Sequence, residues 1–265
     1  MYNIDLSGKT GLVMGVANAR SLAWAIAQPL ALSGARLAYS YQGERILPGL
    51  QELTAGQDAT LIECDVTKDD DLDALFATLA EDYGKIDFVV HALAFAPRVT
   101  FERPFIEVSR EDWRTAMDVS AYSLVAVSQR AAGIMPDGGS ILTLSYLAGE
   151  RVVPNYNMMG VAKAALEASV RYLAYNLGPS GIRVNALSAG PVRTVAARSI
   201  SGFGDMFTEA GRSSMMKRNI EASEVGGMAL ALLCEQLGSG VTGATLYVDA
   251  GFHSIGMFVP DGYEL

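Results

Sequence analysis

Apolar runs of strand length alternate with longer helix-like segments along the whole of this 265-residue sequence. Such alternation is typical of repeated strand–helix–strand units, which build a parallel sheet covered by helices on both faces. We therefore predict a single α/β domain over residues 1–265, with a doubly wound parallel sheet of about seven strands. The predicted strands are Thr10–Met14, Arg36–Tyr41, Thr60–Cys64, Phe88–Ala92, Ser140–Leu144, Arg183–Ser188 and Thr245–Val248. The predicted helices are Leu22–Leu32, Glu44–Ala55, Asp69–Tyr83, Arg110–Ile134, Tyr156–Leu177 and Glu224–Gln236.

The composition suits a compact core and excludes several classes of protein. Hydrophobic residues make up 50% of the chain and charged residues 18%, which excludes a disordered or fibrous chain. The net charge of −9 argues against general binding of nucleic acid or of an anionic membrane surface. No apolar run approaches the roughly 20 residues of a membrane span, and we expect no targeting signal. Cys64 and Cys234 each lie in an apolar run, so we expect buried, reduced thiols and a cytoplasmic protein.

The loop between the first predicted strand and helix matches a nucleotide-binding turn only in part. The strand ends at Gly15 and the following helix is rich in alanine, an arrangement that can bring a pyrophosphate onto helix N-terminal amides. The loop lacks the G-x-G-x-x-G pattern, however. Taken alone, it is equally compatible with nucleotide binding and with an ordinary strand-to-helix turn.

Two further strand ends carry polar residues where the adenosine half of a dinucleotide would lie. Gln42 follows the second strand, where a carboxylate normally binds the ribose hydroxyls, and it can form hydrogen bonds there without charge. Asp65 follows the third strand and could either contact adenine or cap a helix. NADH is favoured over NADPH because Gln42 and Glu44 offer nothing to a 2′-phosphate, although Arg45 could contact one.

A tyrosine and a lysine are separated by seven positions, at Tyr156 and Lys163. If the segment is helical from Tyr156, seven residues turn about 700° and leave the two side chains within about 20° of each other, roughly 10 Å apart along the axis. A phenol and an ammonium could then serve one extended ligand, and the lysine would favour a transient phenolate. The alternative is a chance pair on a half-exposed helix.

Together these segments resemble the enoyl-[acyl-carrier-protein] reductases of bacterial fatty-acid synthesis, a divergent branch of the short-chain dehydrogenase/reductase superfamily. The resemblance runs from about Ser7 to Phe252. It rests on Gly15 to Ser21, Ser40-Tyr41-Gln42, Cys64-Asp65-Val66, His91 with Phe95-Ala96-Pro97, Leu144-Ser145-Tyr146, the Tyr-x6-Lys spacing, Arg183-Val184-Asn185-Ala186 and Ser188-Ala189-Gly190-Pro191. Ordinary short-chain dehydrogenases instead carry Tyr-x3-Lys and a serine about thirteen residues before the tyrosine, where this chain has Thr143.

The resemblance implies a Rossmann-type fold, a homotetramer, and reduction of trans-2-enoyl-[acyl-carrier-protein] by NADH, with NADPH as the second choice of cofactor. It implies that Tyr156, Tyr146 and Lys163 are the catalytic residues and that Ala96 lies against the substrate. The cofactor-binding residues implied in the same way are Gly15, Ser21, Leu22, Gln42, Asp65, Val66, Leu93, Lys163, Val192, Arg193, Thr194, Val195 and Ala196. No metal is expected, because His91 and His253 are the only histidines and are better explained as structural.

Two other functions stay open. A short-chain alcohol dehydrogenase or ketoreductase would share the fold and cofactor, although the Tyr-x6-Lys spacing and Tyr146 argue against it. A non-catalytic dinucleotide-binding protein would bind the cofactor without turnover.

One departure from the family pattern is Ala94, which stands where a glycine usually lines the pocket for substrate and inhibitors. The resemblance implies diphenyl-ether inhibitors as ligands, and we expect the extra methyl group to weaken their binding.

The stretch from residue 191 to residue 219 differs in charge from the rest of the chain. It is +3, from five cations and two acids, in a protein of −9. The charged residues are Arg193, Arg198, Arg212, Lys217, Arg218, Asp205 and Glu209. We expect a substrate-covering lid whose apolar residues cover the acyl chain and whose cations meet the acidic carrier protein. The alternative is a solvated pair of amphipathic helices.

Overall fold

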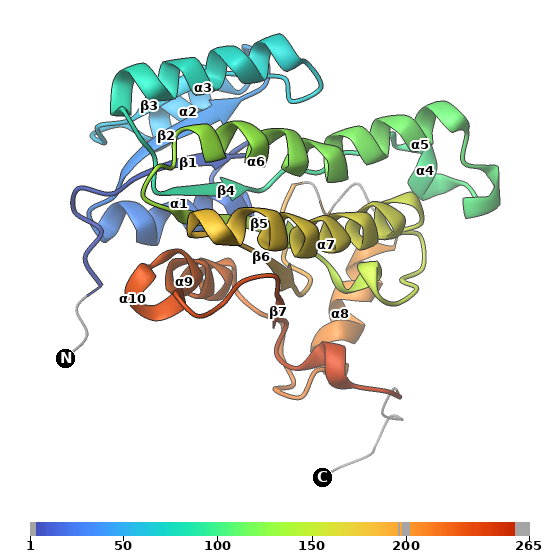
Figure 1. Cartoon of the computed structure of the whole chain (residues 1–265). Helices are drawn as coiled ribbons and strands as arrows, with labels where there is room; N and C mark the ends of the chain where they lie inside the picture. Colours follow the sequence, from blue (N-terminus) through green and yellow to red (C-terminus); the bar gives the residue numbers. More distant parts are fainter. Residues whose placement is uncertain (1–3, 196, 198–201, 258–265) are drawn as a thin grey trace.

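The computed structural model describes residues 4–195, 197 and 202–257 and contains one sheet of seven parallel strands (Figure 1). The strands are β1 (Thr10–Met14), β2 (Arg36–Tyr41), β3 (Thr60–Glu63), β4 (Phe88–His91), β5 (Gly139–Ser145), β6 (Ile182–Ala189) and β7 (Thr245–Val248). Their order is β3-β2-β1-β4-β5-β6-β7, which confirms the predicted doubly wound topology. Because the strand order reverses between β1 and β4, the crevice at their carboxyl ends is the expected ligand site.

Helices cover both faces of the sheet (Figure 1). The longer ones are α1 (Leu22–Leu32), α2 (Leu47–Leu53), α3 (Asp69–Tyr83), α5 (Arg110–Met117), α6 (Ser123–Gly133), α7 (Met158–Leu177), α8 (Phe203–Ser213) and α9 (Ala222–Leu233). Short helical turns are α4 (Val99–Glu102), α10 (Glu235–Gly238), η1 (Phe105–Glu107), η3 (Leu147–Gly149), η4 (Gly178–Ser180) and η6 (Phe252–Ser254). No helix among these described residues is both long enough and apolar enough to cross a membrane.

Alternate residues of each central strand supply two separate apolar cores. Val13 and Val90 pack in the core that contains α1 and α9, whereas their neighbours Leu12 and Val89 pack in the core that contains α3, α6 and α7. Strands buried on both faces need apolar residues at every position, which explains why they read as continuous apolar runs. The two cysteines are buried and unpaired, as predicted.

Helix α1 contains Pro29 and continues through it. Proline has no N–H, so the carbonyl of Ala25 loses its helical partner. Gly226 of α9 packs against this carbonyl, and a Cβ at position 226 would lie 2.2 Å from the Ala25 oxygen. The backbones of α1 and α9 therefore approach closely at the point where the proline removes one helical hydrogen bond.

The predicted helix over Arg110–Ile134 is wrong as a single element. It is divided into α5 and α6 by a π-helical segment, η2 (Asp118–Tyr122). The helix predicted from Tyr156 begins only at Met158. Both differences lie at the carboxyl ends of the strands, where the ligand site is expected. Short π-helical segments inside α-helices are frequent at functional sites.

Candidate active site

The loop after β1 is built around Gly15 and Ser21. Gly15 has φ +96°, and a Cβ there would lie 2.2 Å from the carbonyl oxygen of Ala92, so only glycine fits between the ends of β1 and β4. Ser21 precedes α1, and its Oγ accepts hydrogen bonds from the amides of Ala17 and Asn18, both at 3.1 Å. The serine therefore shapes the loop without capping α1. The Trp24 and Ala25 amides bond to the Ser21 carbonyl, which leaves the amides of Leu22 and Ala23 to face an anion, and this fits a pyrophosphate.

Gln42 and Asp65 follow the paired strands β2 and β3 and lie close together. The Asp65 carboxylate accepts hydrogen bonds from the amide and the hydroxyl of Thr67, at 3.1 and 2.7 Å. Burial raises the pKa of Asp65, but the hydrogen bonds from Thr67 and Gln42 and the charge of Lys68 outweigh it and leave that pKa below its usual value. The residue before α3 is Lys68, so Asp65 does not cap that helix. An ionised acceptor thus lies where an adenosine is expected.

The segment after β4 contains Leu93 and Ala96, the residues predicted to bind the nicotinamide side of the cofactor and the substrate. Ser120, in η2, holds this segment because its hydroxyl accepts a hydrogen bond from the Phe95 amide and donates one to the Phe95 carbonyl, both at 2.9 Å. Ala96 is buried in a small apolar cluster with Met158 and Met159, and Tyr156 packs against the same cluster. The predicted substrate residue and the predicted catalytic tyrosine therefore lie in one place.

The two predicted tyrosines face each other at the carboxyl end of β5. The rings of Tyr146 and Tyr156 are 4.9 Å apart at 58°, and the ring of Phe101 meets Tyr156 edge-on at 6.4 Å. Tyr156 precedes α7, so the predicted helical relation between it and Lys163 is wrong. The backbone around Tyr156 is instead determined by Asn155 and Asn157, which have φ of +64° and +42°. Positive φ at non-glycine residues is costly and is concentrated at functional sites.

Asn157 also ties this turn to the opposite side of the site. Its side-chain amide donates to the carbonyl oxygens of Thr100 and Arg103, both at 3.0 Å. These two bonds connect the residue after Tyr156 to α4, the element that supplies Phe101. They help to offset the backbone strain and to fix the direction of the tyrosine.

Both tyrosines are neutral donors at physiological pH. Burial, together with Tyr146, raises the pKa of Tyr156 well above its usual value. Burial and the charge of Asp249 raise the pKa of Tyr146 to about 12. These shifts run against the expectation that Lys163 favours a phenolate, because burial disfavours the charged form of the phenol.

Lys163 is buried on α7 and is fixed at the end of β5. Its Nζ donates a hydrogen bond to the carbonyl oxygen of Leu144 at 2.7 Å. Burial lowers the pKa of Lys163 to about 8, while the charge of Glu167 acts in the opposite direction. The lysine is thus an ammonium at neutral pH, held beside the strand that leads into Tyr146.

The region from 191 to 219 contains the amphipathic helix α8, which contacts the site through Met206. The Tyr146 hydroxyl donates to the Met206 sulfur at 3.6 Å. Among the predicted cofactor residues of this region, Val192, Thr194 and Val195 form an irregular turn, and the Arg193 guanidinium lies 4.5 Å from the centre of the Phe207 ring. Ala196, and the predicted lid cation Arg198, lie outside the described residues.

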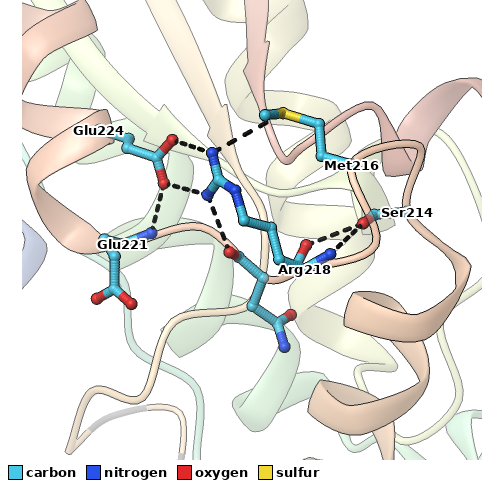
Figure 2. A network of polar contacts seen from close by, with 6 residues as sticks. Ser214, Met216, Arg218, Glu221 and Glu224 are labelled. Atoms are coloured by element: carbon cyan, nitrogen blue, oxygen red, sulfur yellow. Dashed lines mark hydrogen bonds and ion pairs between the residues drawn. The ribbon is translucent and has the colours of Figure 1, made fainter.

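The carboxyl end of this region is tied to α9 by the network in Figure 2. Arg218 makes two bonds to the Glu224 carboxylate, at 2.7 and 2.8 Å. Glu224 also accepts from the Glu221 amide at 2.8 Å, and the Ser214 hydroxyl accepts from the Arg218 amide at 3.1 Å. Arg218 and the Glu221 amide lower the pKa of Glu224 to about 2. Another predicted lid cation, Arg212, pairs with an acid of its own helix, Glu209.

The two histidines have structural partners. His91 is fully buried, with Thr143 Oγ1 at 3.0 Å and Ser123 Oγ at 2.8 Å from its ring nitrogens. Burial, reinforced by the charge of Lys163, lowers the pKa of His91 to about 3. His253 lies 3.0 Å from the Asp249 carboxylate. Across the described part of the chain, no group of three or more His, Cys, Asp or Glu side chains could hold a metal ion.

Several residues that build the site are not indicated by the sequence. Ser120, Asn157 and Glu167 act through partners more than twenty residues away. No local spacing reveals such contacts. The one available signal is Glu167 itself, an acid four residues after Lys163 and therefore on the same side of the helix.

The doubly wound sheet, the Gly15 turn and the tyrosines beside Lys163 define a dinucleotide-binding oxidoreductase of the short-chain dehydrogenase/reductase type. A family model described as Enoyl-(Acyl carrier protein) reductase matches residues 15–253. The chain belongs to that enoyl-acyl carrier protein reductase family, as its sequence motifs indicated.

Individual relatives match over nearly the whole chain. The enoyl-[acyl-carrier-protein] reductase [NADH] 1 of Rhizobium meliloti is 48% identical over 98% of this chain and 96% of its own length. The [NADPH] enzyme FabI of Staphylococcus aureus is 45% identical over 95% and 99%. The crystal structure of the Bacillus cereus reductase with NADP+ and indole naphthyridinone has a TM-score of 0.92 at 47% identity, covering 95% of this chain and 99% of that one. The Anaplasma phagocytophilum reductase with NAD has a TM-score of 0.91 at 42% identity, covering 98% and 97%.

Proposed function

We propose that this protein reduces the trans-2 double bond of enoyl thioesters carried by acyl carrier protein, with NADH as the reductant, in fatty-acid elongation in the cytoplasm. The observation that carries the proposal is the pair of neutral tyrosine hydroxyls, Tyr146 and Tyr156, packed ring to ring beside Ala96. A reaction that places negative charge on a thioester oxygen needs such a donor in a site shielded from water.

The reduced nicotinamide supplies a hydride to the β carbon when it is bound. Tyr156 would donate a hydrogen bond to the thioester oxygen as charge develops there, and its raised pKa keeps the proton on the phenol beforehand. Tyr146 would orient Tyr156 through the ring contact and is our second candidate for a direct contact. The Lys163 ammonium would hold the nicotinamide ribose.

The remaining cofactor residues divide by position in the fold. Gly15, Ser21 and Leu22 would hold the pyrophosphate, since the first-turn amides of α1 have no side-chain cap. Gln42, Asp65 and Val66 would bind the adenosine, Leu93 the nicotinamide side, and residues 192–196 the carboxamide and phosphate. We propose NADH because the exposed side chains after β2 include the uncharged Gln42 and the acidic Glu44, neither of which attracts the 2′-phosphate of NADPH. Arg45 is also exposed and is the one side chain here that could contact that phosphate. Relatives of both the NADH and the NADPH kind match this chain.

We extend the proposal to a lid formed by residues 191–219 of this one domain. Its support is the contact between Met206 of α8 and the Tyr146 hydroxyl. The positive charge of this stretch would meet the acidic carrier protein. Reversing the charge at Arg198 and Arg212 should then slow the carrier-bound substrate more than a coenzyme A substrate. We also propose that the protein forms a homotetramer, as the family resemblance implies.

The test is an absorbance assay of NADH oxidation with two substrates. A crotonyl thioester should be reduced, whereas an acetoacetyl thioester should not. Reduction of the acetoacetyl thioester alone would establish a ketoreductase, and NADH binding without turnover of either substrate would establish a non-catalytic protein. Michaelis constants for NADH and NADPH with the crotonyl thioester decide the cofactor.

A further inference from the structure

Glu167 is a buried acid that the proposed reaction does not use. It lies one helical turn after Lys163 on α7, and each residue is only 5% exposed. The Glu167 carboxylate accepts a hydrogen bond from the hydroxyl of Ser145. Because an ionisable side chain is costly to bury, its position next to a buried lysine requires a physical reason.

Two consecutive residues at the end of β5 bind two consecutive turns of α7. The Leu144 carbonyl accepts from Lys163 Nζ at 2.7 Å, and the Ser145 hydroxyl donates to Glu167. Tyr146 follows directly, so these two bonds fix the backbone that leads into the tyrosine pair. A Cβ on Gly149 would lie 3.0 Å from Glu167 Oε1, which shows how tightly the turn after Tyr146 closes over this carboxylate.

Charged and titratable groups from several elements surround the lysine and the acid. Besides Glu167, they are His91 on β4, Glu150 after η3, Arg171 on α7 and Tyr247 on β7. His91 is neutral, since its pKa is about 3. Burial, together with the charge of Glu150, leaves the pKa of Glu167 above its usual value, although the Ser145 hydrogen bond and the charges of Arg171 and Lys163 act in the opposite direction. Glu167 is the charge that opposes the effect of burial on Lys163.

We propose that Glu167 is a positioning residue whose carboxylate, one helical turn from Lys163 and equally buried, keeps Lys163 in its ammonium form beside β5. This inference rests on the proposed role of Lys163 at the nicotinamide ribose. The negative charge offsets the loss of hydration around the buried ammonium. NADH affinity at alkaline pH is the property that Glu167 should control.

The experiment measures the dissociation constant of NADH by calorimetry between pH 6 and pH 10 in folded variants. In the natural protein the affinity should fall as the pH rises through about 8, where Lys163 loses its proton. In E167Q, which keeps the shape but removes the charge, this fall should occur about one pH unit lower, the shift expected for charges one helical turn apart in a partly buried site. In S145A both charges remain, so the fall should stay at the wild-type pH.

Two further variants make the outcome decisive. E167D restores a carboxylate and should return the fall toward the wild-type pH. K163R stays charged over this whole range, so the alkaline fall should disappear; a fall that persists in K163R overturns the inference without any need for E167Q. A fall at the same pH in E167Q and the natural protein also overturns it.

The failure of the proposed function is distinguishable from the failure of this inference. If K163M binds NADH as tightly as the natural protein, Lys163 has no role at the cofactor, and both proposals fall. If K163M binds weakly but E167Q shows no displacement, only the role of Glu167 is overturned.

Discussion

Replacing Gly15 by alanine should damage both stability and NADH binding, for a reason that can be separated from backbone strain. The new Cβ would lie 2.2 Å from the Ala92 oxygen, about 1 Å closer than such atoms approach, and the residue would keep φ +96°. The left-handed backbone costs an alanine about 1 kcal/mol. The collision adds about 1–3 kcal/mol, as overpacking does elsewhere.

Gly56→Ala is the matched control. Gly56 has a similar φ of +84°, but a Cβ there would meet nothing within 4 Å. This variant should therefore lose only the strain energy of about 1 kcal/mol and bind NADH normally. Because the clash moves the ends of β1 and β4 apart by about 1 Å, Gly15→Ala should raise the Michaelis constant for NADH at least tenfold.

Thermal unfolding and initial-rate kinetics test the pair together. The melting temperature of Gly15→Ala should fall several degrees further than that of Gly56→Ala, since about 1 kcal/mol corresponds to roughly 2–4 °C in a chain of this size. Equal losses of stability in the two variants, with NADH binding unchanged in both, would refute the view that the β1–β4 contact shapes the cofactor site.

Three other variants should give distinct results. Tyr156→Phe should lower kcat about 100-fold or more with little change in the Michaelis constant for NADH, and a smaller loss than in Tyr146→Phe would reverse the assigned roles. Ala94→Gly should bind a diphenyl-ether inhibitor more tightly, and an unchanged inhibition constant would contradict the steric argument. Since the pKa of Glu224 is about 2, its pairing with Arg218 stabilises the fold above the usual carboxyl pKa near 4.3 and is lost as pH falls toward 2. Melting curves of Glu224→Gln should therefore lie below wild type at pH 7 and converge with it near pH 2; a constant gap would refute the argument.

The strand positions were predictable because a strand buried on both faces needs apolar residues at every position. The limits of β1, β2 and β7 agree with prediction. The rings of Tyr146 and Tyr156 pack together, and Lys163 binds the strand that leads into Tyr146, while the catalytic roles of these residues stay predictions. The break at Asp118–Tyr122 was not predictable, because a π-helical turn is stabilised by distant contacts such as Ser120 with Phe95. The same holds for the left-handed residue before α7, Asn157, whose side chain binds α4.

The close contact between α1 and α9 joins two parts of the protein that have separate roles in the proposed function. The N-terminal end of α1 is the proposed binding site of the pyrophosphate. The start of α9 carries Glu224, which binds Arg218 in the segment after α8. Because Gly226 has no side chain, the two helices pack backbone against backbone at this point. The helix whose first turn is proposed to bind the pyrophosphate therefore lies directly against the helix that holds the segment after α8.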